Sequence, residues 1–247
     1  MRKSPKQAKS TAMPVDDQVG AALARLETLG KRDRADLARY GITAQKSFGA
    51  SVASIRLVAK PLGRDQALAA ALWKTGWYEA RMLAAFVGDP ARLTPAQMDR
   101  WCRDFDSWAL CDTLCFHLFD RTPHAWAKVD GWSRDRGEFV KRAAFALLAS
   151  LALHDKTAAD ELFVERLRLI ERAAGDDRNF VKKGVSWALR LIGRRNLALN
   201  EAAVVVARRL ADAEAPAARW VGRDATKELT SPAVRGRLAK KKSRPAR

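Results

Sequence analysis

Helical periodicity runs through almost the whole chain and is the pattern that most limits its possible folds. No stretch shows the sustained alternation of apolar and polar residues that is typical of a β-strand. Turn-forming residues such as Gly30, Gly76 and Pro216 separate the helical segments. Helices are predicted at residues 16–29, 31–39, 50–60, 64–74, 77–87, 94–105, 107–119, 123–132, 137–154, 158–174, 179–194, 198–212, 216–229 and 232–239.

Many short helices joined by short turns favour an all-α fold of stacked helix pairs, which is a repeat solenoid. The sequence shows no clear period, so a compact orthogonal helical bundle is the alternative. We expect one helical domain over residues 16–238. A disordered basic tail is expected at residues 1–15, and a basic, unstructured tail at residues 239–247.

The charge of the chain limits its partners. A net charge of +18 in 247 residues points to nucleic acid or an anionic membrane surface. Residues 1–10 hold four cations and residues 235–247 hold seven, but six more lie between residues 178 and 200, inside a helical pattern without an acid. Three cysteines, no apolar leader and no apolar run that could span a bilayer predict a cytoplasmic protein.

One face of segment 179–195 combines an aromatic ring with cations. The apolar side of this predicted helix carries Val181, Val185, Ala188 and Ile192, and the opposite side carries Lys183, Trp187, Arg190 and Arg194. A large ring on an outward face exposes apolar area unless a partner covers it. A polyanion with flat rings would suit Trp187 and its cationic neighbours, whereas packing of Trp187 against the next helix pair is the alternative.

A carboxylate lies beside apolar side chains in the predicted helix 107–119. Trp108 and Asp112 are four residues apart and share a helix face, which Cys115 and Phe119 continue. These neighbours would remove Asp112 partly from water, and such an environment is common for catalytic carboxylates. A helix cap or a structural salt bridge is the alternative role of Asp112.

Arg142 lies opposite the apolar stripe of the predicted helix 137–154, with Ala146 and Ala149 on its own side. Small neighbours would let a bulky partner approach while the guanidinium forks onto a phosphate. An ordinary solvated arginine, or a salt bridge between repeats, is the alternative.

The remaining candidates predict neither a metal site nor a nucleophile. The three cysteines, with His117 nearby, lack the spacing of a zinc site. The histidines have no serine or cysteine partner in a recognisable arrangement, and we expect no metal and no other cofactor. The other tryptophans are assigned to the core or to packing between helices: Trp73, Trp77, Trp101, Trp126, Trp132 and Trp220.

Three short motifs, taken in their order and spacing, resemble the AlkD-like family of DNA alkylation-repair glycosylases. They are Ser107–Asp112 (SWALCD), Val140–Ala144 (VKRAA) and Phe180–Arg190 (FVKKGVSWALR). Leu72-Trp73 and Tyr78–Ala80 also resemble the N-terminal half of the family, and the similarity covers most of the chain. The resemblance implies HEAT-like helical repeats whose concave basic face curves around duplex DNA.

The resemblance also implies a monofunctional glycosylase for positively charged N-alkylated purines, such as 3-methyladenine and 7-methylguanine. Asp112 would be the catalytic carboxylate that stabilises an oxocarbenium-like sugar and orients water, and Trp108 and Trp187 would contact the lesion and its sugar. The cations expected to bind the DNA backbone are Arg142, Lys182, Lys183, Arg190 and Arg194. Some relatives carry an acid where this chain has Ala109, so Asp112 is the only carboxylate on the inner turns of that motif.

The expected partner is duplex DNA containing alkylated bases, bound by a monomer associated with the nucleoid. One alternative is a non-catalytic helical-repeat protein that binds branched or distorted DNA, although the presence of Asp112 favours the glycosylase. A second alternative is a protein–protein scaffold whose basic tails are incidental.

Overall fold

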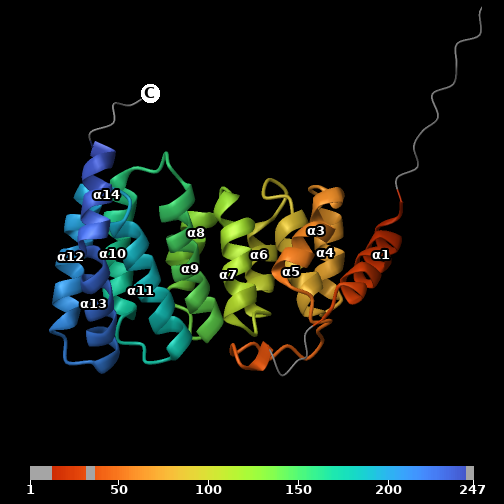
Figure 1. Ribbon diagram of the computed structural model, residues 1–247, viewed down its shortest axis with the longest axis horizontal. Coiled ribbons are helices and arrows are strands. Elements are labelled where there is room, and N and C mark those ends of the chain that lie inside the picture. Colours follow the sequence, from red (N-terminus) through yellow and green to blue (C-terminus); the bar gives the residue numbers. More distant parts are fainter. Residues whose placement is uncertain (1–12, 32–36, 243–247) are drawn as a thin grey trace, which may run out of the picture.

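The computed structural model describes residues 13–31 and 37–242, and these residues form helices and connecting segments without a strand. With the labels of Figure 1, the helices are α1 (Val15–Thr28), α3 (Val52–Leu62), α4 (Gln66–Lys74), α5 (Tyr78–Val87), α6 (Pro95–Arg103), α7 (Trp108–His117), the 3₁₀ helix η1 (Phe119–Arg121), α8 (Ala125–Trp132), α9 (Glu138–His154), α10 (Asp160–Ala173), α11 (Asn179–Gly193), α12 (Leu197–Ala211), α13 (Pro216–Leu229) and α14 (Pro232–Lys242). The predicted all-α fold is confirmed. None of the described helices is both long and apolar enough to cross a membrane.

The helix boundaries agree with the predicted segments to within two residues, except in two places. The segment predicted at residues 31–39 lies largely outside the described residues. At the C-terminal end, α14 continues to Lys242, so the first residues assigned to the basic tail are helical. Alanine and lysine are good helix formers, and a basic run of them extends the helix instead of ending it. The remaining residues of both predicted tails, 1–12 and 243–247, are outside the described part.

The helices stack in two rows along the long axis of the molecule (Figure 1). α5, α7, α9, α11 and α13 pack against one another in succession, and α4, α8, α10 and α12 pack against them from the second row. Contacts between successive pairs are the basis of a repeat solenoid. Because of this order, α7, α9, α11 and α13 bring distant parts of the sequence to neighbouring positions on one surface.

The long helix α9 is the centre of the core. Every residue from Arg142 to Ala152 is buried, and many of them are alanines, which permit close packing. α7, α8 and α11 all pack against α9. A helix that is apolar on all sides belongs in the interior, and α9 thereby fixes the relative positions of α7 and α11.

A glycine sets the distance between α12 and α13. A Cβ atom at Gly222 would lie 2.2 Å from the backbone nitrogen of Ala211 and 2.5 Å from the carbonyl oxygen of Ala207, and these backbone atoms move only if the helices separate. Gly222→Ala is therefore expected to lower the free energy of unfolding by about 1–3 kcal/mol in chemical denaturation. The control is Gly20→Ala in α1, where a Cβ meets nothing within 4 Å. This change should raise stability by up to about 1 kcal/mol, and equal effects at the two positions would contradict the packing argument.

Candidate active site

Four helices of the first row surround one open hollow of about 410 Å³. It is lined by Trp108 and Asp112 from α7, Arg142 from α9, Lys183, Trp187 and Arg190 from α11, and Trp220 and Asp224 from α13. Six of the eight predicted site residues therefore meet at one place. Of the other two, Lys182 lies on α11 and Arg194 is the residue that caps the C-terminal end of this helix.

A second hollow, of about 450 Å³, adjoins the first. It is lined by Tyr40, Gly41, Trp108, Arg142, Asn179, Phe180 and Lys183, so Trp108, Arg142 and Lys183 belong to both hollows. Together, the two hollows form one depression that runs from α13 across α11 to the segment before α3. We refer to the first hollow as the Asp112 hollow.

Asp112 and Arg142 form a bidentate ion pair at the bottom of the Asp112 hollow. Arg142 Nε donates to Asp112 Oδ1 at 2.9 Å, and Arg142 Nη2 donates to Asp112 Oδ2 at 2.7 Å. Arg142 Nη1 donates to the carbonyl oxygen of Phe180 at 2.8 Å. The side chain of Arg142 is 7% exposed and that of Asp112 is 16% exposed. The fork geometry fixes the plane of the carboxylate.

Burial and the ion pair act in opposite directions on Asp112. Removal from water raises the pKa of Asp112 above its ordinary value, and the adjacent guanidinium lowers it. Burial also lowers the pKa of Arg142, but the neighbouring carboxylate outweighs this, so the pKa of Arg142 is raised. Arg142 therefore remains cationic under all ordinary conditions.

The position of Arg142 differs from the sequence-based prediction of a guanidinium turned to DNA. Its small neighbours Ala146 and Ala149 are fully buried, and the bulky partners that approach α9 are α7 and α11. Because three of its donor atoms bind Asp112 and Phe180, the first effect of Arg142 is to hold the carboxylate in place. The salt bridge between repeats, the alternative from the sequence, is the arrangement observed.

Contacts outside the hollow fix each of the two predicted tryptophans. Trp108 Nε1 donates to the carbonyl oxygen of Tyr40 at 2.7 Å. Trp187 stacks on Phe116 of α7, with ring centroids 4.7 Å apart and planes 4° apart. One face of Trp187 is therefore packed, as the alternative interpretation expected, while the residue still lines the hollow. Both indoles are half-buried and have fixed orientations.

The predicted DNA-contacting cations have different surroundings. Lys183 is exposed and lines both hollows, whereas the ammonium of Lys182 lies 5.0 Å from the ring centre of Trp220. Arg190 pairs with Glu228 at 2.7 Å and with Asp224 at 3.4 Å, and Arg194 pairs with Glu228 at 3.4 Å. Acids of α13 therefore partly balance the cations of α11.

Two residues of the Asp112 hollow were missed at the sequence level. Trp220 was assigned to packing, but its side chain is 39% exposed and lines the hollow. Asp224 lies beside it and accepts a hydrogen bond from Ser186 at 2.5 Å. The available signal was the position of Trp220 between Arg219 and Arg223 on a polar helix face, which is the pattern that singled out Trp187.

A serine and a histidine do meet an aspartate outside the hollow. Ser150 Oγ donates to Asp120 Oδ2 at 2.6 Å, and His154 Nδ1 lies 2.6 Å from the same oxygen. Ser150 Oγ also lies 3.2 Å from His154 Nδ1, but this nitrogen donates to the Asp120 carboxylate and therefore cannot accept the serine proton as a base. This cluster ties α9 to η1 and does not form a nucleophilic triad.

Comparison with known proteins supports the fold through one solved structure. One solved structure is described as a member of a new family of proteins related to the HEAT-like repeat DNA glycosylases with affinity for branched DNA structures; it is 20% identical, covers 89% of this chain and 95% of its own, and superposes with a TM-score of 0.71. A designed armadillo repeat protein is 13% identical, with coverages of 88% and 100% and a TM-score of 0.36. None of the curated proteins matches this chain. The first structure establishes a HEAT-like repeat fold.

The family assignment rests on a match that spans most of the chain. A family model described as DNA alkylation repair enzyme matches residues 22–229, which include every residue of the Asp112 hollow. The resemblance of Ser107–Asp112, Val140–Ala144 and Phe180–Arg190 predicted this match. The chain belongs to the DNA alkylation repair enzyme family.

Proposed function

We propose that this protein is a monofunctional DNA glycosylase that hydrolyses the N-glycosidic bond of positively charged N-alkylated purines in duplex DNA. The observation that carries the proposal is the meeting of Asp112, Trp108 and Trp187 in one open hollow beside the exposed cation Lys183. Family membership supports a role in alkylation repair. The substrates that fit this site are of the 3-methyladenine and 7-methylguanine class.

The chemistry of these substrates needs a carboxylate but no acid. Alkylation at N3 or N7 makes the purine a cation, so the base leaves as a neutral molecule without being protonated. As the bond between C1′ and the base nitrogen breaks, the sugar becomes oxocarbenium-like. Asp112 stabilises this positive charge, and it accepts a proton from the water whose oxygen forms the new bond to C1′. The products are a free base and an abasic site.

Arg142 acts in this scheme as a positioning residue. Its two hydrogen bonds hold the carboxylate plane, and each carboxylate oxygen retains lone pairs for water. A fixed anion is worth more to the transition state than a mobile one, because no reorganisation is needed during the reaction.

The tryptophans provide selectivity for charge. An indole face beside a cationic nucleotide contributes on the order of 0.5–2 kcal/mol through a cation–π interaction, and an uncharged purine gains little from it. Trp108 and Trp187 are both oriented by contacts outside the hollow. Lys183 also lines the hollow but is exposed, whereas a lysine that forms a Schiff base is usually activated by desolvation. We therefore expect base release without strand cleavage.

Trp187→Ala is expected to weaken binding of DNA with a cationic lesion by about 2- to 30-fold, corresponding to the cation–π contribution, and binding of undamaged DNA by less. Binding is measured by titration of labelled duplexes with and without one 7-methylguanine. Trp187→Phe is the matched control, since it retains a ring that can stack on Phe116. An equal loss of affinity for both duplexes would show that the ring is merely structural.

A non-catalytic role in binding branched DNA is the second candidate. It is favoured by the description of the structural relative with a TM-score of 0.71, which has affinity for branched DNA structures. Two assays on the same full-length protein separate the candidates: base release from N-methylated duplex DNA, and affinity for four-way branched DNA relative to linear duplex. The glycosylase proposal requires release. Preferential branched-DNA binding without release would favour the second candidate.

A further inference from the structure

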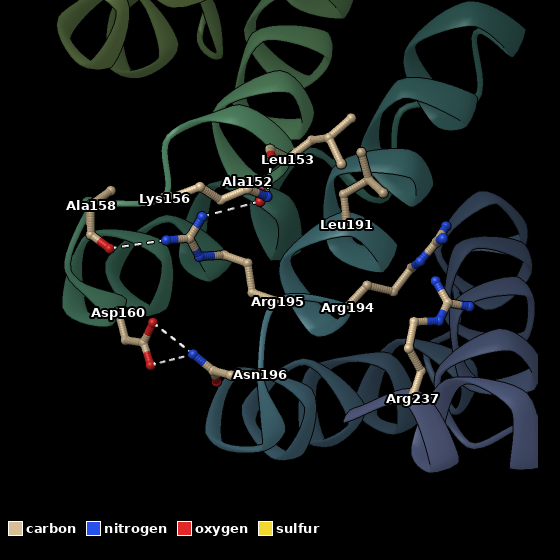
Figure 2. A pocket seen from close by; sticks show the side chains of 10 residues that line it. All are labelled: Ala152, Leu153, Lys156, Ala158, Asp160, Leu191, Arg194, Arg195, Asn196 and Arg237. Atoms are coloured by element: carbon tan, nitrogen blue, oxygen red, sulfur yellow. Dashed lines mark hydrogen bonds between the residues drawn. The ribbon is translucent and has the colours of Figure 1, made fainter. Parts of the chain in front are cut away.

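A separate pocket of about 340 Å³ lies where α9, α10, α11 and α14 meet (Figure 2). Its volume is at the lower end of the range of about 300–1,000 Å³ for ligand pockets. It shares no lining residue with the Asp112 hollow. The charged residues that line it are Lys156, Arg194, Arg195 and Arg237, together with one acid, Asp160.

Two polar side chains fix one side of this pocket. Arg195 donates three hydrogen bonds of 2.6–3.1 Å to backbone carbonyl groups between residues 152 and 158, which ties the end of α11 to the segment after α9. Asn196 donates to both carboxylate oxygens of Asp160, at 3.0 and 2.8 Å (Figure 2). The carboxylate among the lining residues is thus already engaged, and the pocket retains an excess of positive charge.

Arg194, at the C-terminal cap of α11, and Arg237 of α14 reach the same end of the pocket (Figure 2). Glu228 pairs with Arg190 at 2.7 Å and with Arg194 at 3.4 Å, so it balances the charge of Arg194 only in part. Arg237 is exposed, and within residues 13–31 and 37–242 no carboxylate forms an ion pair with it. Two guanidinium groups directed to one end of a pocket repel each other unless an anion balances them.

The helix that supplies Arg237 is anchored in the fold. Val234 and Leu238 of α14 are 4% and 2% exposed, and α14 packs against α12 and α13. The match to the family model ends at residue 229, so α14 and Arg237 lie outside it. The pocket is therefore completed by a part of this chain that family membership does not account for.

We propose that this pocket binds a phosphodiester of the DNA backbone, on the same duplex whose damaged nucleotide occupies the Asp112 hollow. This inference rests on the proposed function, because it takes DNA as the ligand of the protein. Guanidinium groups bind phosphate oxygens through paired hydrogen bonds. Arg194, which caps the C-terminal end of α11, follows Trp187 by seven residues, or about 10 Å at a helical rise of 1.5 Å per residue. This separation corresponds to about three nucleotides at a rise of 3.4 Å.

The test is the salt dependence of binding to an undamaged duplex by the full chain and by Arg237→Gln. Each phosphate contact contributes about 0.9 to the slope of log affinity against log salt concentration. We expect Arg237→Gln to reduce the slope by about 0.9 and to weaken binding about eightfold at 0.1 M salt. Arg237→Lys should retain most of the slope. Arg235→Gln is the matched control, because Arg235 is an exposed cation of the same helix that does not line the pocket.

Equal slopes for Arg237→Gln and Arg235→Gln would overturn the proposal. Inorganic phosphate is titrated in parallel by calorimetry: phosphate binding that Arg237→Gln removes, with an unchanged DNA slope, would assign the pocket to a free anion and also overturn it. Undamaged DNA separates this test from the glycosylase proposal. If the protein releases no base but Arg237→Gln lowers the salt slope as expected, only the glycosylase proposal is rejected. If the protein releases the base but Arg237→Gln leaves the salt slope unchanged, only the proposed phosphate site is rejected.

Discussion

Replacement of Asp112 by asparagine is expected to reduce single-turnover base release from N-methylated duplex DNA by on the order of 10²–10³-fold, the usual effect of removing one electrostatic stabiliser from a transition state. Asparagine has nearly the same shape and keeps one carbonyl oxygen as an acceptor for Arg142, but it carries no negative charge. DNA binding should change little, because Asp112 is an anion and binds no phosphate.

Asp224→Asn is the matched control, since Asp224 is the second carboxylate that lines the same hollow. It is 37% exposed, lies 3.4 Å from Arg190 and accepts a hydrogen bond from Ser186. We expect this variant to retain most base release. A large loss in Asp224→Asn with full activity in Asp112→Asn would move the catalytic role to α13. Thermal unfolding of each variant separates loss of chemistry from loss of fold.

Replacement of Arg142 by glutamine should affect both stability and the pH dependence of base release. Loss of one partner of a largely buried ion pair leaves an uncompensated charge and typically costs about 3–5 kcal/mol. Burial raises the pKa of Asp112 and the Arg142 guanidinium opposes this rise, so the pKa should rise further in the variant. Because the ionised carboxylate is the active form, base release should fall near neutral pH and recover as the pH increases.

The pH profile separates this positioning role from a purely structural one. Arg142→Lys keeps the positive charge but cannot form two parallel hydrogen bonds with Asp112. The pH at which base release falls on the acid side of the profile should therefore change little, whereas the maximal rate of base release should fall more clearly. Profiles are measured in single turnover over the pH range in which each variant remains folded. A rate that falls equally at every pH in Arg142→Gln would contradict the proposed influence of Arg142 on Asp112.

The helical architecture was predictable from the sequence because it depends on local patterns. Turn residues such as Gly30, Gly76 and Pro216 and helical periodicity placed nearly all described helices within two residues. The end of α14 was missed because its last residues were assigned to a tail on charge alone, although Ala239 and the lysines after it favour a helix.

The site was predictable only in part, since its geometry depends on contacts between helices. Helical spacing singled out Asp112, Trp108 and Trp187, the resemblance gave them their expected roles, and the three do share one hollow. The pairing of Arg142 with Asp112 was not predicted, because it depends on how α9 packs against α7. Asp224 was missed for the same reason: periodicity shows which face of α13 is polar but not which helix that face meets.

In the function proposed for this protein, the Asp112 hollow breaks the glycosidic bond of a cationic purine. The most direct measurement is single-turnover release of 7-methylguanine from a duplex with one such base, beside an identical duplex with guanine, using saturating full-length protein. We expect release of the methylated base alone, which leaves an abasic site in an uncut strand. Saturated binding of the methylated duplex without release of its base would contradict the proposed function.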